Sequence, residues 1–253
     1  MTVGSFGPAL AARFDGMELV SESHRSTVLR GRDRTDDAPV ALKIKRWGGG
    51  GRPSEPLGEV SVLLRCDGHP GVPTVREDFV IEGARSYVVV FDWIDGQDLG
   101  RALDERAGGL PLEEVAEVLV GTAGVLDHLH RLGPPVIHGD VKPSNVMREP
   151  SGRIVLIDFD VASTGSFREA TGSEGYLAPE VAAGGSVTPA VDIYGLAATG
   201  ITLITGVPPN EVGDVEPSPP VNVLRRALSI DPGRRPGSAS ALAGEFRDVV
   251  LSD

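Results

Sequence analysis

The chain has 253 residues, of which 40% are hydrophobic and 24% are charged, and these values are ordinary for a soluble globular protein with a large core. Its formal net charge of -12 argues against a general binder of nucleic acid or of anionic membranes, because such binding depends on clustered Lys and Arg. The single Cys66 lies in an apolar run, so we expect its thiol to be buried. Because one Cys cannot form an internal disulfide and no leader or membrane-spanning run is recognised, we expect a cytoplasmic location.

The first part of the chain, residues 13–95, has the pattern of a small, mainly β lobe. Short segments that are rich in Val or that alternate in polarity predict strands. These predicted strands are 17–20, 27–31, 40–45, 73–80 and 86–93. A helix is expected at 57–66, after a connector rich in Gly and Pro that begins at Gly48.

From residue 96 to residue 253 the pattern becomes mainly helical, because apolar residues recur at helical spacing. The predicted helices are 99–107, 112–132, 189–205, 221–228 and 238–251. Short strands are expected between the second and the third of these helices. Residues 91–94 are predicted to join the two parts. The sequence therefore predicts an α+β fold with a small β lobe and a larger α lobe.

The most informative segment is VIHGDVKPSN at 136–145, followed by IDFD at 157–160. Transfer of a phosphoryl group requires one carboxylate to orient the attacking hydroxyl and oxygen ligands to hold magnesium against the phosphates. Asp140 is expected to accept the proton of the substrate hydroxyl, and Lys142 to neutralise charge on the migrating group. Asn145 and Asp158 supply the hard oxygen donors that Mg²⁺ prefers.

These two segments resemble the catalytic loop and the magnesium-binding motif of the protein kinase superfamily. The resemblance covers about residues 15–248 and is closest to bacterial serine/threonine kinases of the eukaryotic-like type. Four further segments carry it: VALK at 40–43, GSEGYLAPE at 172–180, DIYG at 192–195 and DPGRRP at 231–236. It implies a two-lobed protein-kinase fold and transfer of the γ-phosphoryl group of Mg-ATP to protein hydroxyls, with Mn²⁺ as an alternative ion. Lys142 matches the serine/threonine form of the loop.

The resemblance also implies which residues bind the nucleotide. Lys43 is expected to hold the phosphates, and Glu59 is expected to be its ion-pair partner. Apolar residues of the strands would enclose the adenine, and backbone groups of the joining segment would contact its edge. The enclosing residues are Val28, Ala41 and Met147, and the joining segment contributes Asp92 and Ile94.

Supporting roles follow from the same resemblance. His138 is expected to pack in the core under the catalytic loop, with Phe159 and Leu63 stacked on it. Asp192 begins the buried helix that supports this loop, and Arg235 is expected to pair with Glu180. His128 and His130 are two residues apart on a helix, so they point in different directions, do not match metal-ligand spacing and are interpreted as packing or surface residues.

Lysine usage gives an independent argument. The chain has 24 Lys and Arg residues, and its lysines are Lys43, Lys45 and Lys142. A compact ammonium stands at two expected phosphate contacts, where a planar guanidinium would reach and orient differently. Lys45 lies one pleat beyond Lys43 on the same strand face and is interpreted as a solvated strand residue.

The chain departs from the family pattern in four places. Ser21, Ser23 and Ser26 stand at three glycine positions of the phosphate-covering loop, so the loop is expected to be stiffer or to lie further from phosphate. Asp160 replaces a glycine; it tolerates a left-handed backbone but adds negative charge. Gly139 stands where many kinases have an Arg that receives an activating phosphate, so no phosphorylation switch is expected. The stretch 206–222 is short where the family has an additional helix for substrate docking.

Two alternatives stay open. The serine loop and Asp160 favour a pseudokinase that binds a nucleotide or a partner without turnover. The sequence HGD at 138–140 also resembles aminoglycoside and choline kinases, which phosphorylate small molecules. Lys142, the APE sequence at 178–180 and Arg235 argue against that class. The sequence names neither the protein substrate nor an oligomeric state.

Overall fold

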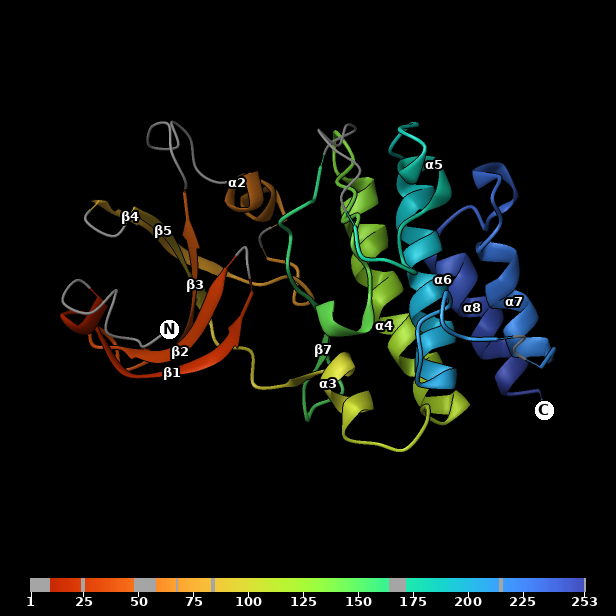
Figure 1. Cartoon of the computed structure of the whole chain (residues 1–253), viewed down its shortest axis with the longest axis horizontal. Helices are drawn as coiled ribbons and strands as arrows, with labels where there is room; N and C mark the ends of the chain where they lie inside the picture. The colour runs from red at the N-terminus through yellow and green to blue at the C-terminus, as the bar shows by residue number, and fades with distance from the viewer. Residues whose placement is uncertain are drawn as a thin grey trace. The chain divides into compact units, whose positions relative to one another are not determined.

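The computed structural model describes residues 10–23, 26–47, 58–66, 68–82, 85–163, 172–213 and 216–252. The chain forms two compact units, Met1–Asp67 with Pro73–Asp95, and Gly68–Val72 with Gly96–Asp253. The first unit consists mainly of strands and the second mainly of helices, as the predicted α+β class requires (Figure 1). None of the helices that the structure describes is long and apolar enough to cross a membrane.

The first unit contains a five-stranded antiparallel sheet with the strand order β1-β2-β3-β5-β4. The strands are β1 (Phe14–Glu22), β2 (Thr27–Asp33), β3 (Pro39–Arg46), β4 (Val75–Ile81) and β5 (Ser86–Asp92). Strand β1 begins before the predicted residue 17, because Phe14 already pairs with Asp33. A break in register between Asp15 and Glu18 accommodates Gly16, whose positive φ of 57° a glycine adopts without strain.

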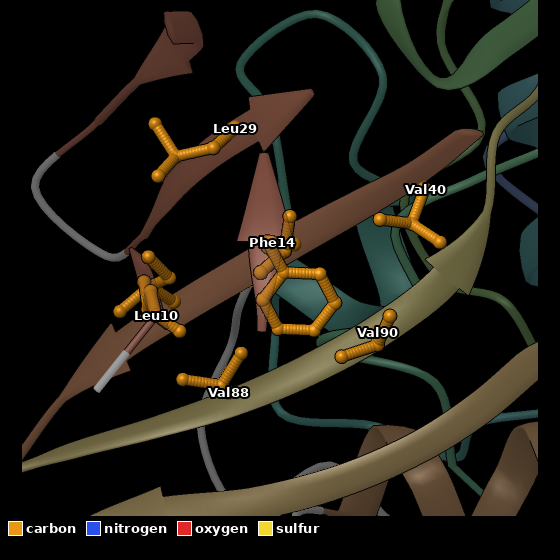
Figure 2. Close-up of a cluster of buried hydrophobic side chains, with 8 residues drawn as sticks. Leu10, Phe14, Leu29, Val40, Val88 and Val90 are labelled. Atoms are coloured by element: carbon orange, nitrogen blue, oxygen red, sulfur yellow. The ribbon is translucent and has the colours of Figure 1, made fainter. Parts of the chain in front are cut away.

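One face of this sheet carries the apolar core of the first unit. Alternation along β3 buries Val40, Leu42 and Ile44 on that face, and the matching residues of β2 and β5 join them. Figure 2 shows this cluster, with Phe14 and Leu10 packed against the strands. The remaining members are Leu29, Val88 and Val90. The intervening residues of β3, which include Lys43, therefore project from the opposite face.

Helix α2 (Gly58–Arg65) is the predicted helix of the first unit. The predicted start at Leu57 and the connector from Gly48 lie outside the described residues. Glu59 stands in the first turn, where a carboxylate interacts favourably with the helix dipole, yet its side chain is buried. That burial requires partners, which are described with the candidate site.

The second unit is built on three helices that lie side by side in Figure 1, α4 (Leu112–Arg131), α6 (Pro189–Thr205) and α8 (Ala239–Val250). Three shorter helices complete it: α3 (Leu99–Asp104), α5 (Pro179–Ala182) and α7 (Pro219–Ala227). Most residues of α6 are buried, including a run of small side chains, so its neighbours approach closely. At Gly200 an added Cβ would lie 3.0 Å from Leu224 of α7.

One difference from the predicted helix bounds has a local cause. Helix α3 ends at Asp104 instead of residue 107, because the chain turns at Gly108, whose φ is 99°. Gly109 then passes so close to α6 that a Cβ would lie 2.0 Å from the carbonyl oxygen of Ile204. Between Gly206 and Ser218 the described residues form no helix, as the short, Pro-rich sequence predicts.

A small sheet with the order β6-β7-β8 carries the segments next to the predicted chemistry. Its strands are β6 (Gln97–Asp98), β7 (Val146–Arg148) and β8 (Ile154–Leu156). Strand β8 packs against α4 at Gly121, where a Cβ would lie 2.5 Å from Cγ1 of Ile154. The absent side chain therefore sets how closely the sheet approaches the helix.

We predict that Gly121→Ala lowers the free energy of unfolding by about 1 to 3 kcal/mol, because the new methyl group overpacks against Ile154. Gly124 is the matched control, since it lies on the same helix with open space around it. Gly124→Ala should stabilise the protein by up to about 1 kcal/mol through helix propensity. Urea unfolding measures both, and equal effects of the two substitutions would contradict the proposed packing.

The last residue of strand β2 is a buried carboxylate, Asp33, which is 1% exposed. Arg13 Nη2 donates to its Oδ2 at 2.9 Å, and Thr35 donates to its Oδ1 from both the amide and the hydroxyl at 2.9 and 2.7 Å. The hydrogen bond from Arg13 is the main reason that the pKa of Asp33 is lowered to about 2, although burial opposes this shift.

Because the pKa of Asp33 is lower in the folded state, its carboxylate stabilises the fold above about pH 4, and we predict that this contribution disappears as the pH falls toward 2. The contribution is about 2 kcal/mol for a shift of this size. Asp33→Asn should lower stability at pH 7 and flatten the stability curve between pH 4 and 2. Asp37→Asn is the control, because the side chain of Asp37 is exposed. If the unfolding midpoint of Asp33→Asn falls with decreasing pH as steeply as that of the unmodified protein, the assignment to Asp33 is refuted.

Candidate active site

A buried carboxylate on α6 holds the loop that carries Asp140. Asp192 is 1% exposed, its Oδ2 accepts the amide N–H of His138 at 2.9 Å, and its Oδ1 accepts that of Gly139 at 2.7 Å. His130 Nε2 lies 2.8 Å from the same Oδ2. Gly139 has a positive φ of 79°, which glycine adopts without strain. The prediction that Asp192 supports this loop is confirmed.

A second contact from α6 fixes the loop at Val141. Thr199 Oγ1 lies 3.2 Å from the carbonyl oxygen of Val141, as well as 2.8 Å from that of Gly195 in its own helix. At Gly195 an added Cβ would lie 3.1 Å from both Cβ and the carbonyl oxygen of Val141. Glycine on the helix therefore allows the backbone of the loop to lie directly on α6.

The carboxylate of Asp140 accepts hydrogen bonds from three residues, two of the same loop and one of the segment before α5. Lys142 Nζ lies 2.7 Å from Oδ2, Asn145 Nδ2 lies 3.0 Å from the same oxygen, and the amide of Ser173 lies 3.0 Å from Oδ1. Asn145 Nδ2 also donates to the main-chain carbonyl of Asp140 at 2.8 Å. The side chain is 12% exposed, so it is fixed in one orientation while it stays accessible.

Burial raises the pKa of Asp140, but the hydrogen bond and charge of Lys142, with the hydrogen bond from Ser173, outweigh it. The pKa therefore lies below the ordinary value for an aspartate. At neutral pH the group is an ionised carboxylate that can accept hydrogen bonds and orient a hydroxyl.

Lys142 connects Asp140 to the segment that precedes α5. Its Nζ lies 2.7 Å from Asp140 Oδ2 and 2.5 Å from the hydroxyl oxygen of Ser173. The side chain is 22% exposed. Ser173 thus contacts the pair twice, through its amide and through its hydroxyl. Three further hydroxyl residues that precede Ser173, namely Thr164, Ser166 and Thr171, lie outside the described residues.

The two predicted magnesium ligands lie on adjacent backbone segments. Asn145 closes a short 3-10 turn, η3 (Pro143–Asn145), and its carbonyl oxygen accepts the amide of Ile157 at 2.8 Å. Asp158 follows Ile157 directly and has a positive φ of 65°, which is uncommon for a residue other than glycine. Asn145 uses its amide nitrogen toward Asp140, which leaves its side-chain oxygen as the atom suited to a cation.

His138 is a core residue, as predicted. It is fully buried, its Nε2 lies 3.0 Å from the carbonyl oxygen of Ile157, and its ring packs edge-on against Phe159 at 4.8 Å between centroids. This contact ties the segment of Asp158 to the loop of Asp140. A role of His138 as a general base is therefore not supported, because its ring is occupied within the core.

Arg235 and Glu180 form the predicted ion pair. Nη1 and Nη2 of Arg235 lie 2.7 Å from the two carboxylate oxygens of Glu180, and the arginine side chain is 0% exposed. Arg235 also donates to the carbonyl oxygens of Ala190 and Ser229 at 2.8 and 3.0 Å, and it stacks on Tyr194. The pair therefore joins α5, α6 and the turn before α8.

In the first unit, Lys43 Nζ lies 2.7 Å from Oε1 of Glu59, so the predicted ion pair is present. Lys45 Nζ lies 2.8 Å from Oε2 of the same carboxylate, and its side chain is only 16% exposed. The prediction that Lys45 is a solvated strand residue is wrong. Alternation places it on the face of Lys43, and α2 covers that face with Glu59.

The residues expected to enclose the adenine lie in both units. In the first unit, Val28 pairs with Lys43 and Ala41 pairs with Phe91, which places Val28 and Ala41 on the sheet face opposite the apolar cluster. Asp92 is half-exposed, and Arg76 Nε binds its carboxylate at 2.8 Å. Ile94 follows β5 and is partly buried, and Met147 lies in β7 of the second unit and is also partly buried.

The serines of the loop after β1 close its hairpin. The amide of Ser23 donates to the carbonyl of Ser26 at 2.9 Å, and the amide of Ser26 donates to Oγ of Ser23 at 3.1 Å. Ser21 lies further back on β1, paired with Val28. The side-chain bond supplies a local contact that a glycine at residue 23 could not make.

Comparison with known proteins agrees with this geometry. The protein kinase domain family matches residues 17–218. Serine/threonine-protein kinase PkaA of Streptomyces coelicolor is 41% identical over 194 residues, which cover 72% of this chain. Serine/threonine-protein kinase PknK of Mycobacterium tuberculosis is 30% identical over 95% of this chain. The chain therefore belongs to the protein kinase family, and these relatives are bacterial serine/threonine kinases.

A solved structure agrees with the fold. The crystal structure of the Mycobacterium tuberculosis PknI kinase domain superposes with a TM-score of 0.71 at 27% identity, covering 93% of this chain and 96% of that one. The chain corresponds to only part of the length of the curated relatives. The chain spans 33% of the length of PkaA and 24% of the length of PknK.

Sequence reasoning missed three supporting residues. His130 is interpreted above as a packing or surface residue, but it contacts the buried carboxylate of Asp192. Thr199 lies in an apolar helix, and nothing in its local sequence indicates that it binds the loop at Val141. Lys45 has a weak signal in its spacing from Lys43. Each of these contacts joins residues far apart in sequence, so a local pattern could not reveal it.

We predict that Arg235→Lys lowers the free energy of unfolding by about 3 kcal/mol, because a lysine at this buried position cannot reproduce the two-pronged bond to Glu180 together with the bonds to the carbonyl oxygens of Ala190 and Ser229. The adjacent Arg234→Lys is the control, since that side chain is 79% exposed. It should change stability by less than about 0.5 kcal/mol. Thermal and urea unfolding measure both, and a small effect at residue 235 would show that the pair contributes little.

Proposed function

We propose that the protein is a serine/threonine protein kinase, which transfers the γ-phosphoryl group of Mg-ATP to hydroxyl groups of a protein substrate. The observation that carries this proposal is the carboxylate of Asp140, ionised and held by Lys142, Asn145 and the amide of Ser173. Membership of the protein kinase family supports it. The activity, substrates and partners of the whole protein are part of the proposal, because the full-length relatives are much longer than this chain.

In the proposed reaction, the oxygen of a substrate hydroxyl attacks the γ-phosphorus, and the bond from that phosphorus to the bridging oxygen breaks, so ADP leaves. Asp140 orients the hydroxyl and accepts its proton. The lowered pKa of Asp140 suits the first task, because the group is fully ionised before the substrate binds. The bonds from Lys142, Asn145 and Ser173 keep the carboxylate from rotating, so little reorganisation is needed when the hydroxyl arrives.

Lys142 is proposed to neutralise the charge that spreads over the transferring phosphoryl group. Its ammonium has three N–H bonds, of which Asp140 and Ser173 occupy two directions, so one remains for a phosphoryl oxygen. Ser173 then links this lysine to the segment before α5, where we propose that the substrate binds. The ion pair of Arg235 and Glu180 fixes α5, which follows that segment directly.

The residues present fit a magnesium ion and a nucleotide. Asn145 can offer a side-chain oxygen and Asp158 a carboxylate, and both are ligand types that Mg²⁺ or Mn²⁺ accepts. When bound, the ion supplies positive charge to the phosphates of ATP. In the first unit we propose that Lys43, oriented by Glu59, contacts the phosphates, and that Val28, Ala41, Asp92 and Ile94 contact the adenine. Met147 of the second unit is proposed for the same role as Val28 and Ala41. Ser21, Ser23 and Ser26 line the loop that covers the phosphates.

A pseudokinase is the second candidate, and the loop between β1 and β2 favours it. The main-chain bond between Ser23 and Ser26 is joined by a bond from the amide of Ser26 to Oγ of Ser23, which a glycine at residue 23 could not accept. Asp160 adds a negative charge two residues after Asp158. A small-molecule phosphotransferase is less favoured, because the bonds from Ser173 to Asp140 and Lys142 belong to a segment suited to protein substrates.

We also propose a cytoplasmic location. Cys66 is a buried thiol, and its Sγ lies 3.2 Å from the carbonyl oxygen of Val62 in the preceding helical turn. Burial raises its pKa, so the thiol stays protonated and unreactive. A chain with one structural thiol suits a reducing compartment.

We predict that Asp140→Asn lowers phosphoryl transfer at least about a hundredfold while ATP affinity stays nearly unchanged, because the substitution removes the proton acceptor but preserves the shape. Incubation with labelled ATP, magnesium or manganese and generic protein substrates measures transfer, and calorimetric titration measures ATP binding. Lys43→Ala should instead weaken both. Transfer by Asp140→Asn at the unmodified rate would refute the catalytic assignment. An unmodified protein that binds Mg-ATP but transfers nothing would favour the pseudokinase.

A further inference from the structure

Glu59 in the first unit is a buried carboxylate shared by two lysines. It is 4% exposed, its Oε1 lies 2.7 Å from Lys43 Nζ, and its Oε2 lies 2.8 Å from Lys45 Nζ. The lysine side chains are 9% and 16% exposed, so the whole group is largely removed from water. Each oxygen of the carboxylate thus has its own ammonium partner.

The geometry of β3 explains why a second lysine reaches the same carboxylate. Residues 43 and 45 project from one face of the strand, while Ile44 between them belongs to the apolar cluster on the other face. Both lysines lie next to the central strand β5, opposite Val89 and Tyr87, which are buried. A low-dielectric neighbourhood strengthens interactions between charges, so the loss of one charge from this group has a large effect.

Two consequences for Lys43 follow. A carboxylate bound through one oxygen can still turn about its last side-chain torsion, which has broad minima, whereas bonds at both oxygens fix its plane. Lys43 therefore keeps a defined position at Oε1. In addition, Lys45 places a second positive charge beside the carboxylate of Glu59.

We propose that Lys45 is a positioning residue for the phosphates of the nucleotide: by binding Oε2 of Glu59 it fixes the carboxylate that orients Lys43, and it adds a second positive charge beside that carboxylate. The inference rests on the proposed function, in which Lys43 contacts those phosphates. It assigns to Lys45 a role that its local sequence did not indicate. The ligand it favours is the polyphosphate part of a nucleotide, not the nucleoside.

The test compares ATP with adenosine, because adenosine lacks the phosphates. In calorimetric titrations with magnesium, Lys45→Met should weaken ATP binding about tenfold and change adenosine binding less than about twofold, since the lost charge acts on phosphate alone. Lys45→Arg retains the charge and should keep ATP affinity within about threefold of the unmodified protein. In transfer assays, Lys45→Met should raise the KM for ATP more than it lowers kcat.

Arg32→Met is the matched control. It removes one positive charge from the same sheet, at an exposed side chain that pairs with Asp37, and it should leave both affinities unchanged. Thermal unfolding of every variant establishes that each is folded. If Lys45→Met lowers the Tm but leaves the ratio of ATP to adenosine affinity unchanged, Lys45 only ties α2 to the sheet, and the proposal is overturned.

The same titrations separate this inference from the proposed function. If the unmodified protein binds ATP but transfers no phosphoryl group, the proposed kinase activity fails, while the effect of Lys45→Met on ATP binding still decides the role of Lys45. If the unmodified protein binds adenosine and ATP equally well, no phosphate contact exists in the first unit. That result would overturn the positioning role directly.

Discussion

Asp192 brings a carboxylate into the core of the second unit, where water cannot solvate it. A charged group in such a place must be satisfied by hydrogen bonds, and it obtains them from two consecutive main-chain amides, those of His138 and Gly139. The position of the loop is therefore determined by the requirement to satisfy this carboxylate. Asp140 follows directly, so its orientation depends on a residue that lies more than fifty positions later in the chain.

Two other carboxylates, the buried Glu59 and the partly buried Glu180, organise the structure in the same manner. Glu180 is held by the buried guanidinium of Arg235, and Glu59 by the ammonium groups of Lys43 and Lys45. The partner choice follows the geometry of each site. Arg235 presents a planar fork that matches the two oxygens of one carboxylate and also reaches two carbonyls, whereas each lysine binds one oxygen as a compact charge. Removal of one partner would leave a buried charge uncompensated, so these contacts specify the arrangement strongly.

Glycine has a comparable role where backbone segments approach each other. Gly195 allows the carbonyl of Val141 to lie on α6, and Gly109 passes the end of the same helix. At Gly139 a positive φ turns the chain between the two amides that Asp192 binds and the carboxylate of Asp140. Many kinases have an arginine at this position, and an arginine here would have to adopt a left-handed backbone. Glycine at residue 139 therefore removes a phosphate-binding side chain, and it also adopts the positive φ of this turn without strain.

Much of the candidate site could be predicted from short segments of sequence. The spacing of Asp140, Lys142 and Asn145 is local, because a turn and a 3-10 helix bring these side chains together within six residues. The pairs of Lys43 with Glu59 and of Arg235 with Glu180 were predicted by resemblance, and both are present. The local pattern was misleading at Lys45, since a lysine on a strand usually faces water. It could not show that α2 covers that face.

The sequence by itself determined the α+β class through the periodicity of its apolar residues. Through the resemblance of its short motifs to a known family, it also indicated the family and the polar residues expected at the site. The tertiary structure decided which polar groups become buried and therefore what must bind them. His130 and Thr199 acquire their roles only when α4 and α6 meet the loop, and Lys45 only when α2 packs on β3. Burial is a property of the packed units, so no single segment encodes it: a charge is satisfied by whichever donors the fold brings within reach.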